Sequence, residues 1–405
     1  MNTRTARLGF WWVLLAAAGT FAVTMGTRQT MGLFIGPLNT QTGLGLANIS
    51  LAFAFGQLWW GLTQPFAGVV ADRIGAGRVL LIGTGLVALG TAITPYMTST
   101  AGLIFAVGVL SAGGAGMAGP AVLMAATNRL VEPSRRGMAT GIVNAGGSFG
   151  QFALAPVAAG LIGAVGWVGS MQAMALVVLL ALPAAWVLRG GGTQAALATA
   201  PALGTRDALA QAWAWPSFRL LCAGFFVCGF HVAFLATHLP GVVAECGLSA
   251  QWAGWALAML GAFNIVGSLA MGWAVGRWRM KNLLSLVYAV RGVAIVVFLI
   301  APKSGAVVLA FAAVMGLTFL STVPPTAGLV ARFFGPANMA TLFGVVMLSH
   351  QVGGFLGAWL GGTVYQRTGS FTAVWLIDIA LAAAAALIHL PIREQAAPPL
   401  RAQAA

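Results

Sequence analysis

Twelve long apolar runs constrain this 405-residue chain more than any other feature of its sequence. Each run holds about 20 mostly apolar residues, the length that an α-helix needs to cross the hydrocarbon core of a bilayer. Only 6% of the residues are charged, whereas a soluble domain has about 25%. This composition excludes a cytosolic enzyme and predicts an all-α membrane protein with twelve transmembrane helices. The runs lie at residues 10–34, 47–70, 79–97, 102–127, 138–163, 168–188, 219–241, 250–274, 283–301, 306–330, 339–364 and 371–391.

The basic residues set the orientation of these predicted spans. With the N-terminus inside, 16 of the 20 Lys and Arg residues fall in cytoplasmic segments, and only Lys303 and Arg367 fall outside. Such a bias predicts that the N and C termini are both cytoplasmic. The net charge of +14 is therefore a topology signal, and we expect no nucleic-acid partner.

The longest polar connection divides the predicted spans into two groups of six. Met138-Ala-Thr opens the fifth run and Met339-Ala-Thr opens the eleventh, so similar triplets stand at equivalent places. This repetition argues for two pseudo-symmetric six-helix bundles. We expect an N-terminal bundle at 1–189, a cytoplasmic interdomain loop at 190–217, a C-terminal bundle at 218–395 and a disordered tail at 396–405.

The connection between the second and third runs carries a recognisable motif. Its sequence at 68–78, GVVADRIGAGR, resembles the loop signature of the major facilitator superfamily, G-x-x-x-D-R-x-G-x-x-R. The resemblance implies two helical bundles around a central cavity, with alternating access by rocking of one against the other. It also implies a conformational latch formed by Asp72, Arg73 and Arg78; the alternative is a plain basic turn. In the second half Gly276 replaces the acid, so that copy lacks the latch.

Two further segments resemble the bacterial monocarboxylate-transporter-like branch of that superfamily. They are RGMATGIVNAGGSFG at 136–150 and TRQTMGLF at 27–34. The small residues of the first predict close approach of two helices. Classical members of the branch carry a substrate-binding arginine in span eight, where this chain reads NIVGS at 264–268. The arginine is missing, which puts recognition of lactate or oxalate by that residue in doubt.

Arg28 is the sharpest substrate hint in the chain. An ionisable side chain inside a span is costly and marks a functional or paired group. Thr24 precedes Arg28 by one helical turn, so both share a polar face, and first spans line the cavity in this fold. An unpaired guanidinium in a cavity favours a carboxylate, held by two parallel hydrogen bonds. The alternative is an arginine that reaches up to water or packs against backbone carbonyls.

Other polar side chains in the spans are further candidates for substrate binding. A histidine titrates near neutral pH, so His231 is also a candidate for proton coupling. Each candidate is equally explained as a hydrogen-bonded contact between helices. The candidates are Gln29, Asn144, Gln151, His231, Asn264, His350 and Gln351.

Arg291 and Asp378 are the remaining charges within the predicted spans. Their depths differ by about 6 Å at 1.5 Å per helical residue, a gap that an arginine side chain covers. We expect a structural ion pair between them, with proton coupling by Asp378 as the alternative. Pro324-Pro325 removes two backbone donors inside the tenth run, which predicts a helix break or hinge at the cavity.

These observations predict a secondary active transporter, not an enzyme. We expect it to move a small organic anion across the inner membrane, coupled to protons or by exchange. The alternatives are an efflux pump for amphipathic neutral compounds, with an apolar cavity and Arg28 turned away, and a sensor that binds without flux. No phosphate-binding motif or metal-ligand cluster occurs in the sequence, so we expect no cofactor and no metal. We expect a monomer whose partners are the substrate and the lipid bilayer.

Overall fold

The computed structural model describes residues 3–132, 135–189, 205–335 and 339–398, and every regular element in these ranges is a helix. We call residues 3–189 the N-terminal half and residues 205–398 the C-terminal half. The N-terminal half contains α1 (Thr3–Thr30), η1 (Met31–Phe34), α2 (Ile35–Thr42), α3 (Leu46–Ile74), α4 (Ala76–Ile93), η2 (Thr94–Tyr96), α5 (Thr100–Leu103), the π-helix η3 (Ile104–Ala112), α6 (Gly113–Met117), α7 (Pro120–Leu130), α8 (Arg136–Leu179) and α9 (Leu182–Val187).

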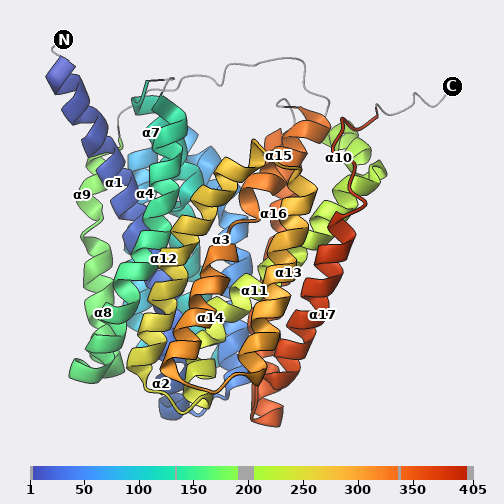
Figure 1. The fold of residues 1–405 in the computed structure, drawn as a ribbon. Helices are drawn as coiled ribbons and strands as arrows, with labels where there is room; N and C mark the ends of the chain where they lie inside the picture. Colours follow the sequence, from blue (N-terminus) through green and yellow to red (C-terminus); the bar gives the residue numbers. More distant parts are fainter. Residues whose placement is uncertain (1–2, 133–134, 190–204, 336–338, 399–405) are drawn as a thin grey trace.

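The C-terminal half contains α10 (Thr205–Ala214), α11 (Pro216–Glu245), α12 (Ala250–Val275), α13 (Met280–Ile300), α14 (Gly305–Thr318), α15 (Val323–Phe334), α16 (Met339–Thr368) and α17 (Thr372–His389). The long helices stand side by side (Figure 1). The start of α1, helix α10 and the last turn of α17 lie at one end of the bundle, which we call the terminal end. Helix α2 lies at the other, which we call the α2 end.

Ten segments of the described chain are long and apolar enough to cross a membrane. The twelve predicted runs differ from this set in two places. Helix α3, which carries Gln57 and Gln64, covers the second run but is not among the ten. The fifth and sixth runs form one segment, Met138–Val187, in which Gly166 has a φ of 74°. A positive φ favours glycine because it has no Cβ, and here it turns the chain between the two predicted runs.

The expected interdomain loop and the expected disordered tail both contain residues with defined contacts. Residues 190–217 were expected to form a loop, but residues 205–214 form α10, whose Ala208 and Ala212 are buried. Residues 396–405 were expected to form a disordered tail, but Ala397 N donates to Phe333 O at 2.8 Å. Residues 190–204 and 399–405 lie outside the described ranges. In both places alanine side chains pack against the same buried cluster of the C-terminal half. The amino-acid composition of these segments does not predict this packing.

Small residues bring the helices into close contact within and between the halves. A Cβ added at Gly26 of α1 would lie 2.6 Å from the backbone carbon of Gly150 on α8. Such an approach is possible only where side chains are absent on both helices. Between the halves, α3 packs on α16 and α8 packs on α12. A Cβ added at Gly254 of α12 would lie 2.6 Å from the Cβ of Ala159 on α8. These packings fix the helices that surround the cavity described next.

Candidate functional site

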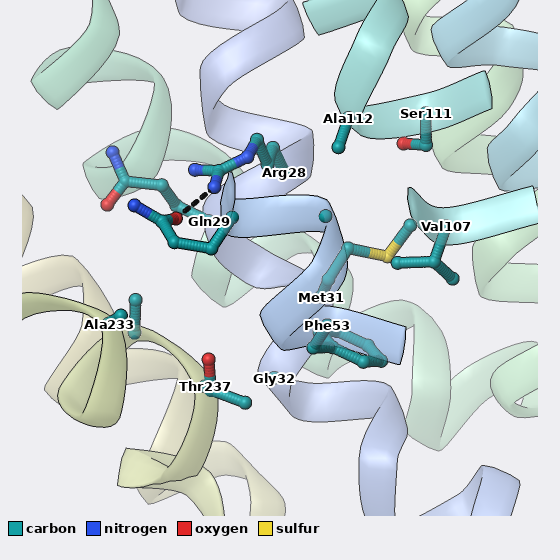
Figure 2. Close-up of a pocket in the computed structure, with 13 residues that line it drawn as sticks. Arg28, Gln29, Met31, Gly32, Phe53, Val107, Ser111, Ala112, Ala233 and Thr237 are labelled. Carbon is teal, nitrogen blue, oxygen red and sulfur yellow. Dashed lines mark hydrogen bonds between the residues drawn. The ribbon is translucent and has the colours of Figure 1, made fainter. Parts of the chain in front are cut away.

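A small cavity of about 50 Å³ lies where the two halves meet. Arg28 and Gln29 of α1 line it together with Phe53 and Gln57 of α3, and Thr237 of α11 lines it from the C-terminal half. Figure 2 shows the labelled side chains around this space. The cavity has room for a few water molecules, at about 10–15 Å³ each by this measure. None of its lining residues in the described chain is acidic.

Arg28 lies where α1 passes into a 3-10 helix. It stands in the last turn of α1, which ends at Thr30 before the 3-10 helix η1. The Arg28 guanidinium donates to Gln57 Oε1 (Figure 2). It also lies 4.8 Å from the centre of the Trp60 ring. The side chain is half-buried and lines the cavity.

Gln57 links Arg28 to the other half of the molecule. Its Nε2 donates to Gln351 Oε1 on α16 at 2.9 Å, and both glutamines are buried. The chain of contacts therefore runs from α1 through α3 to α16. Sequence reasoning missed Gln57. The signal that could have found it is an amide in an apolar run, flanked by Gly56 and Gly61 where a neighbouring helix approaches closely.

The two halves are in contact at the α2 end of the molecule. A Cβ added at Gly32 of η1 would lie 2.7 Å from the carbonyl oxygen of Ala236 on α11, so η1 lies directly against α11. At the start of α3, Ala47 N donates to Gln366 Oε1 of α16 at 2.7 Å. These contacts join η1 to α11 and the start of α3 to α16.

The structure brings few of the candidate substrate residues to this cavity. Only Arg28 and Gln29 of those candidates are among its lining residues in the described chain. Thr24 is buried and its hydroxyl donates to Thr20 O at 2.9 Å within α1. Asn144 is exposed on α8. The expected polar face of α1 is thus used largely inside its own helix, because a threonine hydroxyl reaches the carbonyl one turn earlier.

Asn264 and Gln151 lie at the contact between α8 and α12. Asn264 Nδ2 donates to Ser148 Oγ at 2.8 Å, and its Oδ1 accepts from Leu320 N at 3.1 Å. Asn264 therefore joins α8 and α12 to the chain between α14 and α15. Gln151 is fully buried, and both amide atoms lack a hydrogen-bond partner in the described structure.

His231 and His350 are buried inside the C-terminal half. His231 Nε2 lies 3.3 Å from Asp378 Oδ1 and 3.1 Å from the Asp378 carbonyl oxygen. The His350 ring centre is 4.9 Å from that of Phe225. On α11, the cavity-lining Ala233 stands about 200° around the helix from His231, at 100° per residue. His231 therefore points away from the cavity and toward α17.

The expected ion pair between Arg291 and Asp378 is not formed in the described structure. Arg291 instead donates to the carbonyl oxygens of Thr318 and Phe319, the latter at 2.8 Å. Asp378 Oδ1 lies 3.3 Å from His231 Nε2. The reason is local: the chain breaks between α14 and α15, where Pro324 and Pro325 follow, and the break frees carbonyls that attract the guanidinium.

The predicted latch lies on the turn from α3 to α4. Helix α3 ends at Ile74, and Gly75, with a φ of 93°, leads into α4. Only glycine adopts such a φ without strain, so the motif glycine has a clear structural reason. Arg73 and Arg78 are exposed. The side chain of Asp72 lies outside the described part of the structure.

A family model described as Major Facilitator Superfamily matches residues 16–303 and 221–405. The chain belongs to the Major Facilitator Superfamily. It is 26% identical to monocarboxylate transporter 13 of Rattus norvegicus, over 94% of this chain and 89% of that protein. It is 23% identical to the oxalate:formate antiporter of Oxalobacter formigenes, over 91% of this chain and 88% of that protein. These relatives place it in the monocarboxylate-transporter-like branch.

Solved structures have the same fold. The nucleoside transporter NupG superposes with a TM-score of 0.79 at 14% identity, covering 95% of this chain and 99% of that chain. The D-xylose-proton symporter superposes with a TM-score of 0.69 at 16% identity, covering 97% and 99%. The chain is accordingly a multi-pass membrane transporter of this superfamily and not an enzyme.

Proposed function

We propose that this transporter moves a small organic anion, a carboxylate, by alternating access. The observation that carries the proposal is Arg28, a guanidinium in the lining of a cavity that has no acidic lining residue in the described chain. A guanidinium fork matches the two oxygens of a carboxylate and forms stronger hydrogen bonds with it than with a neutral amide. The names of the relatives, which include a monocarboxylate transporter and an oxalate:formate antiporter, support this substrate class.

The alternative, export of amphipathic neutral compounds, requires Arg28 to point away from an apolar cavity. The position of Arg28 in the cavity lining, beside Gln29 and Gln57, speaks against it. The apolar side chains that share the lining, such as Phe53 and Val107, favour a substrate with a short apolar body beside its carboxylate.

For the membrane topology we propose twelve spans in two six-helix bundles, with both termini in the cytoplasm of an inner-membrane protein. Adding α3 to the ten apolar segments, and dividing Met138–Val187 at Gly166, gives this number. The terminal end of the bundle would then be cytoplasmic, and the α2 end, where the halves are in contact, would face outward.

For coupling we propose that the buried pair of His231 and Asp378 carries a proton. Both side chains are 1% exposed, and their nearest side-chain atoms are 3.3 Å apart. A carboxylate and an imidazole in such a place share a proton readily, because an unpaired buried charge is costly. Arg291 supplies the neighbouring fixed positive charge. The latch role of Asp72, Arg73 and Arg78 is likewise a proposal, drawn from the superfamily motif.

Thermal stabilisation of the purified protein tests the substrate class. Acetate, lactate and oxalate are added to the wild type and to Arg28→Gln, and Tm is measured. A ligand at 100 times its Kd stabilises the folded state by about 2.7 kcal/mol. We expect at least one carboxylate to raise the Tm of the wild type but not of Arg28→Gln. Arg367→Gln, at an exposed arginine of α16, is the matched control and should respond like the wild type.

Flux into liposomes completes the test. The carboxylate that stabilises the wild type should be taken up by proteoliposomes containing the wild type and not by those containing Arg28→Gln. If apolar compounds stabilise the protein and no carboxylate does, the anion proposal is wrong and export of neutral compounds takes its place. Binding without any flux would instead indicate a sensor.

A further inference from the structure

The side-chain amides of Gln57 and Gln351 meet across the two halves, next to Arg28. Gln57 uses its Oε1 to accept from Arg28 and its Nε2 to donate to Gln351 Oε1 at 2.9 Å. Gln351 is 2% exposed, and its Nε2 is buried without a hydrogen-bond partner in the described structure. A buried donor with no acceptor is unfavourable. The site therefore contains one donor that is ready to take a partner.

Two glycines make room for this pair of glutamines. A Cβ added at Gly61 of α3 would lie 2.6 Å from the Gln351 amide carbon. A Cβ added at Gly354 of α16 would lie 2.9 Å from Gln57 Cγ. Each helix thus has a glycine where the glutamine of the other helix fits. The packing of α3 on α16 therefore has specific space for the contact between the two amides.

We propose that a bound carboxylate replaces Gln57 on Arg28, and that the released Gln57 Oε1 then accepts from Gln351 Nε2. The two amides would form a reciprocal pair with two hydrogen bonds in place of one. Occupancy of the substrate site is thereby coupled to the contact between the halves. This inference rests on the proposed function, because it takes a carboxylate as the ligand of Arg28.

Counting donors and acceptors supports the exchange. In the ligand-free arrangement the Arg28 guanidinium donates to the neutral amide oxygen of Gln57, and Gln351 Nε2 has no hydrogen-bond partner in the described structure. In the occupied arrangement the guanidinium holds a carboxylate, whose charge-assisted hydrogen bonds are roughly twice as strong. Gln57 and Gln351 then satisfy each other. Every polar group that the exchange touches gains or keeps a partner.

The exchange has a mechanical consequence. Gln57 belongs to α3 in the N-terminal half and Gln351 to α16 in the C-terminal half. A second hydrogen bond between them draws these two helices together, so the substrate strengthens one interface of the cavity. Coupling of this kind is reciprocal: bringing α3 and α16 together must also strengthen carboxylate binding. Gln57 and Gln351 act here through Arg28 and are positioning residues.

A distance measurement between α3 and α16 tests the proposal. Spin labels are attached to Phe66→Cys on α3 and Leu348→Cys on α16, both at exposed positions, in full-length protein that also carries Cys246→Ser. Acetate, lactate and oxalate are the probes, and Tm is recorded on the same samples. We expect the carboxylate that raises Tm to shift the distance distribution to shorter values.

Two variants and a matched control isolate the amide pair. Gln351→Leu removes both atoms that Gln57 uses, so the ligand should still raise Tm but produce no shortening. Its apparent affinity should fall on the order of tenfold, the value of one to two hydrogen bonds. Gly61→Ala displaces Gln351 and should have the same effect. Gly344→Ala, on the partner helix α16, has open space around its added Cβ and should behave like the wild type.

The outcomes separate this inference from the proposed function. If carboxylates bind in an Arg28-dependent way and the distance in Gln351→Leu shortens as it does in the wild type, the amide pair is not the coupling element. If the wild type binds but its distance does not change, the inference is also wrong while the substrate proposal stands. If no carboxylate binds the wild type, both are overturned.

Discussion

Nε2 of His231 lies 3.3 Å from Oδ1 of Asp378, and the two side chains join α11 to α17 inside the C-terminal half. Asp378 of α17 is therefore in contact with this histidine and forms no ion pair with Arg291 of α13 in the described structure. Arg291 instead donates hydrogen bonds to the carbonyl oxygens of Thr318 and Phe319, at the break between α14 and α15. One buried region thus contains a histidine next to a carboxyl group and, close by, an arginine bound to the carbonyls of a helix break.

Asp378→Asn should separate proton coupling from substrate exchange. The amide keeps a polar contact to His231 but cannot carry a proton in the way a carboxylate does. We expect uptake driven by a pH gradient to fall at least tenfold in proteoliposomes, while exchange of internal for external carboxylate continues. Asp207→Asn on the exposed surface of α10 is the control and should leave both rates unchanged. Full gradient-driven uptake by Asp378→Asn would rule out the proposed proton site.

Arg291→Met should destabilise the protein. Arg291 is 1% exposed and donates to two carbonyls that the helix break leaves without helical partners. Loss of charged hydrogen bonds to buried acceptors costs about 3 kcal/mol. We expect a marked decrease of Tm in detergent. Arg277→Met is the comparison, because Arg277 is exposed and donates to the Trp273 carbonyl of its own helix. Equal Tm values for the two variants would contradict this assignment.

Gly150→Ala should force α1 and α8 apart. The added Cβ would overlap with the carbonyl of Ala22, which is backbone and cannot move independently. Overpacking of this kind costs about 1–3 kcal/mol or more. We expect a lower Tm and a lower yield of folded protein. Gly141→Ala lies on the same helix with open space around its Cβ and should be tolerated. A Gly150→Ala protein as stable as the wild type would mean that the two helices are less closely packed.

Gln151→Leu should stabilise the ligand-free protein. Gln151 is fully buried, and its amide oxygen and nitrogen have no hydrogen-bond partner in the described structure. An unsatisfied buried polar group costs about 1–3 kcal/mol, which an apolar side chain of similar size avoids. Denaturation of wild type and variant in the same detergent measures the difference. A decrease of Tm would indicate that the amide has a partner in solution, as a substrate-binding role requires.

The features that the sequence predicted correctly are those that depend on a single helix or turn. Apolar length predicted long helices, and ten segments of the described chain are long and apolar enough to cross a membrane. The Pro324-Pro325 dipeptide predicted a break where α14 and α15 are separate helices. The motif around Asp72 identified the superfamily that the family comparison then established. Arg28 stood out because a cation within a span is rare. Each of these signals is contained in a short stretch of chain.

The partners of the polar side chains were decided by the tertiary structure. Gln57 and Gln351 are 294 positions apart, and His231 and Asp378 are 147 positions apart. Which of them meet depends on the rotation and depth of each helix in the bundle, and close contacts at glycines fix both. The sequence by itself determined the class of protein, its all-helical apolar character and the presence of a cation in its first apolar run. Only helix packing decided that Arg28 donates to Gln57, and that Arg291 donates to the carbonyls between α14 and α15 and not to Asp378. The physical reason is that a buried polar group forms hydrogen bonds with those groups that the packed helices place within reach.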